Sequence, residues 1–346
     1  MTTTETTPAV SVIIPTFNRG ELLVHTLNSV REQTLSNWEA MVIDDGSSDN
    51  TEELVQTMIR ADSRVRFLKR ARAPKGAGTC RNLGLAASKG EYVVLLDSDD
   101  LLGPTCLENR VKLMRQHPAA RFAVFPALLF RAELEDTMLL WNVDSDEPDS
   151  RRFLRGDSVW PMNGPIWRRE FISGLGGCDE QLTCWQDVDL NIRSLLVNPQ
   201  YLRRLDNPPD CFVRKHPSES ISQNGLRGRD SVRSMARVFE KGCRGTREIR
   251  RASGHNGETT QALLAAFMHI LDISIADRLW DLSRKVLGVA RRNRLITTGN
   301  WLLWHYALAV HDTKWSAALR APSLRRKLTA GLHLPTTIGT ERYVPG

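Results

Sequence analysis

Short apolar runs rich in β-branched residues alternate with amphipathic segments along the first hundred residues. The runs, typical of buried strands, occupy residues 9–14, 38–43, 65–69 and 92–96. Apolar positions at helical spacing predict helices after residue 20, over about 51–60 and over 78–88. Pro15 is expected to end the first strand. Strands and helices in alternation predict βαβ units, and therefore an α/β fold with a mostly parallel sheet flanked by helices.

The pattern weakens after residue 101 and then changes. A helix is predicted around 107–116 and a strand over 122–129, while the acidic stretch 144–149 is expected to form an exposed loop. Beyond Ser220 strand patterns give way to helical ones, as at 261–275 and 278–290. We therefore predict an α/β region over residues 1–225 and a mainly helical region over residues 226–346.

Composition places the chain among ordinary globular proteins. Of its 346 residues 41% are hydrophobic and 25% are charged, which argues against disorder or a fibre. No basic and apolar signal-peptide pattern opens the sequence, and apolar stretches such as 301–310 are too short to cross a bilayer. The six cysteines form no C-x-x-C pair, so neither a zinc ribbon nor a disulfide framework is expected. A cytoplasmic location is therefore expected.

The charge is unevenly distributed. Residues 226–346 hold 21 Lys/Arg and 9 Asp/Glu, whereas residues 1–225 hold 26 and 31. Nucleic acid, anionic lipid headgroups or a phosphorylated acceptor would each suit the basic region. No nucleic-acid-binding motif is found, so no nucleic-acid partner is expected. Basic clusters at 291–294 and 325–327, with the apolar segment 301–304, suggest peripheral contact with the inner face of a membrane.

Acidic residues follow two of the predicted strands, where parallel sheets collect their chemistry. Asp97-Ser98-Asp99-Asp100 is either a solvated turn or a site for Mg²⁺ or Mn²⁺, because hard cations favour carboxylate oxygens. An EF-hand is excluded, since leucines stand where a ligand and a glycine are required. Of Asp44 and Asp45, one is expected to form an Asx turn and the other to bind a ligand. Neither G-x-G-x-x-G nor a P-loop motif is present.

These residues, in this order, closely resemble the family-2 glycosyltransferases of the GT-A fold. The resemblance covers residues 10 to about 222 and rests on segments that are individually weak but correctly ordered. They are Pro15-Thr16-Phe17-Asn18-Arg19, Val42-Ile43-Asp44-Asp45-Gly46-Ser47-Ser48-Asp49, Gly78-Thr79-Cys80-Arg81-Asn82-Leu83-Gly84, Lys89-Gly90-Glu91-Tyr92-Val93, Leu96-Asp97-Ser98-Asp99-Asp100, Leu175-Gly176-Gly177-Cys178-Asp179-Glu180 and Trp185-Gln186-Asp187-Val188-Asp189-Leu190. Residues after 226 resemble no family that we can name.

The resemblance implies roles in binding a nucleotide-sugar donor, most simply a UDP-sugar. Asp45 would bind the uracil ring, and Arg81 would pack near that base or reach the phosphates. Pro15, Thr16 and Asn18 would line the nucleotide cleft. Asp97 and Asp99 match the D-x-D element, in which the acids bind the ribose and the Mg²⁺ or Mn²⁺ that neutralises the diphosphate leaving group.

The resemblance also implies a general base for the acceptor hydroxyl, which would belong to a carbohydrate or a lipid-linked carbohydrate. The family's Glu-Asp motif reads Gln186-Asp187 here, so Asp187 is the predicted base for an inverting displacement. Asp189 is the alternative, although an acid there also suits the first helical turn. Trp185 is either a platform for a sugar ring or a packing residue. Late basic residues would close over the diphosphate: Arg214 as a phosphate ligand and His216 as a metal ligand.

Two rival functions remain open from the sequence. A sugar-phosphate nucleotidyltransferase would also bind a nucleotide and Mg²⁺, but it should carry a glycine-rich basic loop after the first strand. A non-catalytic binding or scaffold protein on the same fold is compatible with Gln186. The presence of Asp45, Asp97 and Asp187 argues against it.

Overall fold

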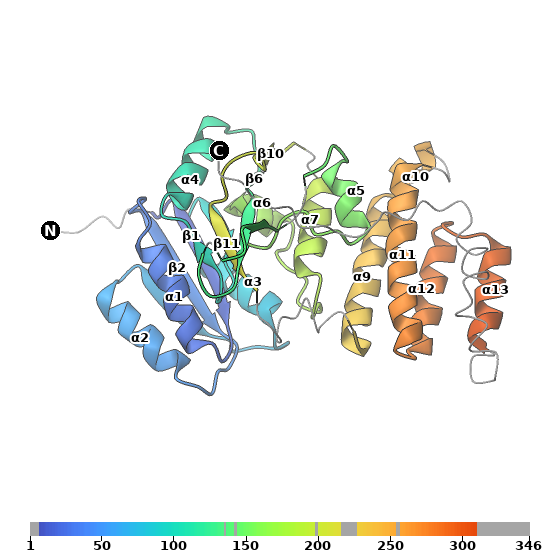
Figure 1. The fold of residues 1–346 in the computed structure, drawn as a ribbon, viewed down its shortest axis with the longest axis horizontal. Coiled ribbons are helices and arrows are strands. Elements are labelled where there is room, and N and C mark those ends of the chain that lie inside the picture. Colours follow the sequence, from blue (N-terminus) through green and yellow to red (C-terminus); the bar gives the residue numbers. More distant parts are fainter. Residues whose placement is uncertain are drawn as a thin grey trace.

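The structure is a computed structural model that describes residues 7–134, 136–141, 144–197, 200–215, 227–253 and 257–309. A seven-stranded sheet has the order β10-β6-β9-β4-β1-β2-β3, and a four-stranded sheet has the order β5-β11-β7-β8 (Figure 1). The first sheet is parallel except for β9, which runs antiparallel to β4 and β6.

The elements of the sheet region alternate as the sequence predicts. Its strands are β1 (Val10–Thr16), β2 (Trp38–Asp44), β3 (Val65–Lys69), β4 (Tyr92–Leu95), β5 (Leu101–Leu102), β6 (Phe122–Val124), β7 (Ala127–Phe130), β8 (Leu139–Leu140), β9 (Pro165–Arg168), β10 (Leu202–Arg203) and β11 (Cys211–Arg214). Its helices are α1 (Gly20–Arg31), α2 (Thr51–Ala61), α3 (Ala77–Ala87), α4 (Cys106–Gln116), α5 (Asp149–Leu154), α6 (Arg169–Gly174) and α7 (Gln186–Val197).

Both faces of the central strands are buried, because helices cover each of them. On β1, Val12 and Ile14 join a cluster with residues of α1, α2 and α4, whereas Ile13 joins a second cluster with residues of α3 and α6. This two-sided burial explains why the strands are mostly apolar on both faces rather than alternating, apart from the hydrogen-bonded pair Ser11 and Glu39. The sheet is therefore a rigid support for the loops at its carboxyl edge.

Three details differ from the sequence prediction. β1 continues through Pro15 to Thr16, because its pairing with β4 ends at Ile13 and the missing N–H costs no ladder bond there. The strand predicted over 122–129 is two strands, separated at Phe125-Pro126. The stretch 144–149 is not wholly exposed, because Asp149 begins α5 and is buried.

The described residues beyond 226 are helical, as predicted. They form α9 (Arg229–Gly245), α10 (Arg247–Ser253), α11 (Glu258–Ala276), α12 (Trp280–Arg292) and α13 (Thr298–Ala309). Helices α9, α11, α12 and α13 stand side by side at the end of the molecule away from α1 and α2 (Figure 1). One buried apolar cluster joins residues of α3, α7, α9 and α11. The predicted boundary at residues 225/226 lies outside the described residues, as does the basic cluster 325–327.

Helix α11 corrects the expectation that every apolar stretch is too short to cross a bilayer. An 18-residue window within its 19 residues has a mean hydropathy of 1.4, enough by length and composition for a membrane span. However, 61% of this window is buried inside the protein, where α11 packs against α5, α9 and α12. The hydropathy of α11 is thus accounted for by its place at the centre of the helical region.

Candidate functional site

The loops that follow β1, β2 and β4 lie side by side, because these strands are neighbours in the sheet and run in the same direction. The Asp45 N–H donates to the Thr16 carbonyl at 2.9 Å, and the Leu96 N–H donates to the Ile13 carbonyl at 3.0 Å. The sheet edge therefore gathers the predicted residues Pro15, Thr16 and Asn18 with the acids of the other two loops. This edge is the topological position at which open α/β sheets bind ligands.

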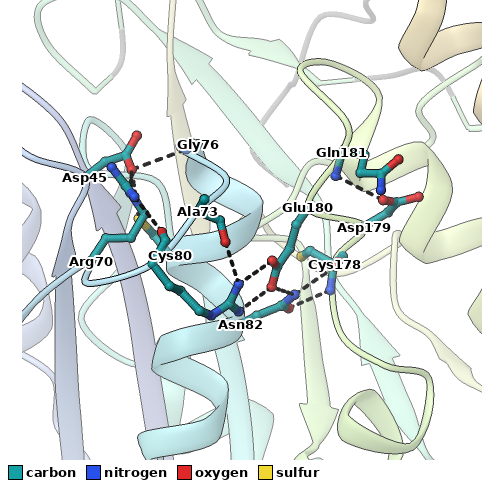
Figure 2. Close-up of polar contacts among 11 residues, drawn as sticks. Asp45, Arg70, Ala73, Gly76, Cys80, Asn82, Cys178, Asp179, Glu180 and Gln181 are labelled. Atoms are coloured by element: carbon teal, nitrogen blue, oxygen red, sulfur yellow. Dashed lines mark hydrogen bonds and ion pairs between the residues drawn. The ribbon is translucent and has the colours of Figure 1, made fainter.

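One of the two acids after β2, Asp44, forms the Asx turn that the sequence predicts, and ligand binding by the other, Asp45, stays a prediction. Asp44 accepts hydrogen bonds from the Gly46 and Ser47 N–H groups at 3.2 and 3.1 Å, which makes it the turn residue. Asp45 instead lies among donors from α3 and the segment before it (Figure 2). Its Oδ1 accepts from Arg70, from the Gly76 N–H at 3.2 Å and from the Cys80 thiol at 3.6 Å.

All three donors to Asp45 use the same oxygen, Oδ1, so none of these bonds occupies Oδ2. The side chain is 9% exposed and is held in one orientation by an ion pair with Arg70. Burial raises the pKa of the adjoining Cys80 thiol to about 12, with a further contribution from the Asp45 charge. This thiol therefore stays a neutral donor, and the side chain of Asp45 is held in place through Oδ1 alone by these three donors.

Asn18 joins the loops after β1 and β2. It has a positive φ of 50°, which Asn tolerates better than most residues. Its N–H donates to the Ser47 hydroxyl at 2.9 Å, and its side-chain oxygen accepts from the Ser48 N–H at 2.8 Å. Asn18 thus has a structural role in joining the two loops, and its place in a nucleotide cleft stays a prediction.

The three acids after β4 occupy different surroundings. Asp97 is the most accessible, with a side chain that is 38% exposed, and its Oδ1 accepts from Arg81 at 2.5 Å. Asp99 is ion-paired with Arg19, a residue of the β1 loop. Asp100 is buried and accepts from Asn163 at 3.1 Å. Burial, together with the charges of Asp99 and Asp97, raises the pKa of the Asp100 carboxyl well above its ordinary value.

Arg214, predicted to bind phosphate, lies beside this acidic loop. Its N–H donates to Asp100 at 3.0 Å, and its guanidinium donates to the carbonyl oxygens of Asp99 at 3.1 Å and Arg131 at 2.8 Å. The second predicted residue of this segment, His216, lies outside the described residues.

The residues fit a cation that takes most of its ligands from a substrate. Among the described residues, no group of three or more His, Cys, Asp or Glu side chains is arranged to hold a metal by itself. Mg²⁺ commonly uses only one or two carboxylates together with substrate phosphates and water. Asp97 and Asp99 supply such carboxylates at the sheet edge.

The first turns of α3 connect the separate parts of the site. Cys80 contacts Asp45, and the next residue, Arg81, reaches Asp97 and the side-chain oxygen of Gln186. Arg81 has a side chain that is only 6% exposed. Two consecutive residues of one helix therefore connect the acid after β2, the acid after β4 and the start of α7.

Asp187 and Asp189 lie on the first turn of α7 in contrasting surroundings. Asp189 is 1% exposed and is ion-paired with Arg193 at 2.9 Å and with Lys241 of α9 at 2.7 Å. Asp187 accepts a hydrogen bond from the Ser158 hydroxyl at 2.8 Å. Burial raises the pKa of the Asp187 carboxyl, and the bond from Ser158 only partly opposes this effect. Asp189 is thus engaged in two ion pairs, whereas Asp187 is held by a neutral hydroxyl donor, and its role as the base stays a prediction.

Trp185 lies directly before α7 in a strained conformation, with φ at 57°. Its ring is parallel to that of His269 on α11, with centroids 6.3 Å apart. A Cβ added to Gly156 would lie 2.6 Å from the indole. Trp185 therefore packs between the α5–β9 loop and the helical region, while its side chain remains partly accessible.

Sequence reasoning missed four partners that fix these acids. Arg70 holds Asp45, Arg19 holds Asp99, Ser158 holds Asp187 and Lys241 holds Asp189. Arg19 ends the motif that follows β1, residues 15–19, so its positive charge near an acidic loop was a signal that the sequence offered. Ser158 and Lys241 are brought in by the tertiary fold, and no spacing in the sequence indicates them.

Comparison with known proteins finds similarity to glycosyltransferases in part of the sequence. The model of glycosyl transferase family 2 matches residues 11–153. An uncharacterized glycosyltransferase of Haemophilus influenzae is 23% identical over 287 residues, covering 81% of this chain and 91% of that protein. The poly(ribitol-phosphate) beta-N-acetylglucosaminyltransferase TarP of Staphylococcus aureus is 46% identical over 102 residues, covering 29% of this chain and 31% of TarP. The chain thus aligns with less than a third of TarP.

The fold also resembles that of a solved structure. The structure of S. aureus TarS residues 1–349 in complex with UDP-GlcNAc has a TM-score of 0.61 to this chain at 18% sequence identity, covering 87% of each. The predicted GT-A-type arrangement, an α/β sheet region followed by helices, is therefore confirmed. The segment that matches the family model contains Asp45, Arg81, Asp97 and Asp99.

Proposed function

We propose that this chain is a family-2 glycosyltransferase that transfers a sugar from a UDP-sugar to an acceptor hydroxyl with inversion at the anomeric carbon. One observation carries the proposal: α3 holds Asp45, Asp97 and the start of α7 together at the carboxyl edge of a parallel sheet. In the proposal, Asp45 would bind the base, Asp97 would act at the diphosphate and Asp187 of α7 would be the general base, all in one site.

Donor binding would use three carboxylates, Asp45, Asp97 and Asp99, each of which is ion-paired with an arginine. Asp45 Oδ2 would accept the uracil N3–H, while Oδ1 stays bound to Arg70 and Gly76. Pro15, Thr16 and Asn18 would line the nucleotide cleft, and Arg214 would approach the phosphates. Asp97 and Asp99 would hold Mg²⁺ or Mn²⁺, which would neutralise the charge of the departing diphosphate. The neighbouring TarS structure contains UDP-GlcNAc, which supports UDP as the nucleotide.

Transfer would require one proton acceptor. Asp187 would accept the proton of the acceptor hydroxyl as its oxygen forms a bond to the anomeric carbon. The bond between that carbon and the diphosphate oxygen would break, and the electron pair would leave with UDP. Ser158 would orient Asp187 by its 2.8 Å hydrogen bond. Attack from the face opposite the leaving group inverts the configuration. Trp185, beside the base, would contact the acceptor sugar.

The acceptor is proposed to be a carbohydrate, free or lipid-linked, in polysaccharide or glycoconjugate synthesis. Relatives support this class: one is a GalNAc(5)-diNAcBac-PP-undecaprenol beta-1,3-glucosyltransferase of Campylobacter jejuni. A cytoplasmic location is proposed because the six cysteines are buried free thiols. Residues 226–346 are proposed as a separate basic region that contacts the inner face of a membrane peripherally.

The structure gives mixed support to membrane contact through the segment 301–304. Leu302 and Leu303 are 56% and 42% exposed on α13. Trp304 is buried, and Trp301 packs under Arg291, whose guanidinium lies 4.1 Å from the ring centroid. The exposed edge that could meet lipid is thus aliphatic, with basic residues at the end of α12 nearby.

The decisive experiment measures release of UDP, GDP or dTDP from their sugar conjugates, without an acceptor and in the presence of Mn²⁺. We expect slow hydrolysis of a UDP-sugar, UDP-GlcNAc being the first to test, and no hydrolysis by Asp187→Asn. A binding scaffold would shift its melting temperature with a sugar nucleotide but release no nucleoside diphosphate. Absence of both effects with every conjugate would refute the proposal.

A further inference from the structure

Arg81 has contacts that its predicted role near the nucleotide does not explain. One terminal nitrogen donates to Asp97 Oδ1 at 2.5 Å, and the other donates to Gln186 Oε1. The Arg81 side chain is 6% exposed, whereas that of Asp97 is 38% exposed, so both bonds start from a buried guanidinium and are themselves partly buried. Arg81 thus spans from the donor acid after β4 to the first residue of α7, the helix that carries Asp187.

Both polar atoms of the Gln186 side-chain amide form hydrogen bonds. Its oxygen accepts from Arg81, and its nitrogen donates to the Leu182 carbonyl at 2.7 Å. A glutamate at this position could accept from Arg81 but could not donate to Leu182. Glutamine therefore forms a connected path of hydrogen bonds from Asp97 to the loop before α7. It also adds no negative charge beside Asp97 and Asp187.

The geometry points to Arg81 and Gln186 as positioning residues that act as one unit and set the place of Asp187 relative to Asp97. This inference rests on the proposed function, in which Asp97 belongs to the donor site and Asp187 to the acceptor site. A base works only within hydrogen-bond reach of the proton that it accepts. A misplacement of about 1 Å can cost on the order of 100-fold in rate, so a rigid connection between the two acids has catalytic value.

Arginine is the side chain that can make this connection. Its planar fork presents separate N–H groups to two acceptors, whereas a lysine ammonium is a point charge on a flexible chain. Arg81→Lys keeps the charge beside Asp97 but loses the fixed geometry. Gln186→Leu keeps a side chain of similar size but removes both hydrogen bonds that the Gln186 amide makes. These two variants therefore separate the charge of the connection from its geometry.

The test compares Gln186→Leu, Arg81→Lys and the double variant with Gln181→Leu, a control on the exposed side chain five residues earlier. We expect Gln186→Leu to lower kcat for UDP-GlcNAc hydrolysis by roughly 10- to 100-fold while KM changes less than about threefold. The control should match the wild type. If the two residues act as one unit, the double variant should lose no more than the worse single variant.

Unfolding supplies a readout that is independent of turnover. A double-mutant cycle on the unfolding equilibrium should give a coupling of at least about fivefold between Arg81 and Gln186. The inference would be overturned by any of three results: losses in kcat that add in the double variant, a wild-type kcat in Gln186→Leu, or a coupling factor near one, which means no coupling. If the cycle shows this coupling but the wild type hydrolyses no sugar nucleotide, the proposed function is refuted instead.

Discussion

Replacing Asp187 with asparagine should remove transfer without weakening the fold, whereas the same change at Asp189 should do the reverse. Asp187→Asn keeps the shape and the acceptor oxygen for Ser158 but cannot take a proton. Asp189→Asn leaves the proposed base intact but removes a carboxylate that is 1% exposed and ion-paired with Arg193 and Lys241. The two acids are two residues apart on α7, which makes them a matched pair.

The magnitudes follow from the contacts of each acid. Loss of a general base typically costs about 10²–10⁴ in rate. The pKa of Asp187 is raised in the folded protein, so this carboxyl binds its proton more tightly there than in the unfolded chain. Its ionisation therefore costs stability as pH rises from its ordinary pKa through the folded one, and Asp187→Asn should melt at or above the wild-type temperature at pH 7.

Asp189→Asn should lose stability because it breaks two charged hydrogen bonds at a buried site. Hydrogen bonds to charged groups contribute about 1.5–3 kcal/mol each. Arg193 keeps its bonds to the Leu175 and Gly177 carbonyls, and Lys241 keeps its ion pair with Asp179. We therefore expect a net loss of about 2–3 kcal/mol rather than the full sum of both bonds.

The assay is UDP release from UDP-GlcNAc over pH 4–9, beside a thermal melt of each variant. Wild-type kcat should fall on acidification, with its midpoint above the ordinary aspartate pKa of 3.8, because protonation of Asp187 removes the base. Asp189→Asn should retain this profile at temperatures below its melt. The assignment of Asp187 is refuted if Asp187→Asn turns over normally while folded Asp189→Asn is inactive.

Four further predictions concern metal, nucleotide, packing and membrane. Asp99→Ala and excess EDTA should each abolish turnover and strongly weaken UDP binding in calorimetry; full activity in EDTA would exclude a required cation. Asp45→Ala should weaken UDP binding by about 10-fold or more, from the loss of a charged hydrogen bond to the base, and equal binding of UDP and GDP by the wild type would contradict this role. Gly156→Ala should lower the melting temperature, because φ is 89° and the new Cβ would lie 2.6 Å from the Trp185 ring, whereas Gly174→Ala, which meets nothing within 4 Å, should not. Flotation should recover the protein with anionic vesicles at low salt but not at high salt; equal recovery with neutral vesicles, or none with either, would remove the membrane proposal.

The sheet and its carboxyl edge could be predicted because local signals and tertiary packing agree there. β1, β2 and β4 are apolar on both sides, so they read as buried strands of a parallel sheet. The acids that follow them then meet at one edge by topology alone. The Asx turn after β2 was also accessible, since a turn residue accepts from the N–H groups just after it, although the sequence left open whether Asp44 or Asp45 forms it.

What could not be predicted is how each acid is held, because the partners come from distant parts of the chain. Gln186 illustrates this: beside the family's motif it reads as a lost carboxylate and an argument for a scaffold. In the fold its amide oxygen accepts from Arg81 and its amide nitrogen donates to the Leu182 carbonyl. An ionised glutamate could not make the second bond. The departure from the motif therefore strengthens a connection within the site. Whether a substitution weakens or supports a site depends on the donors and acceptors that the fold places around it.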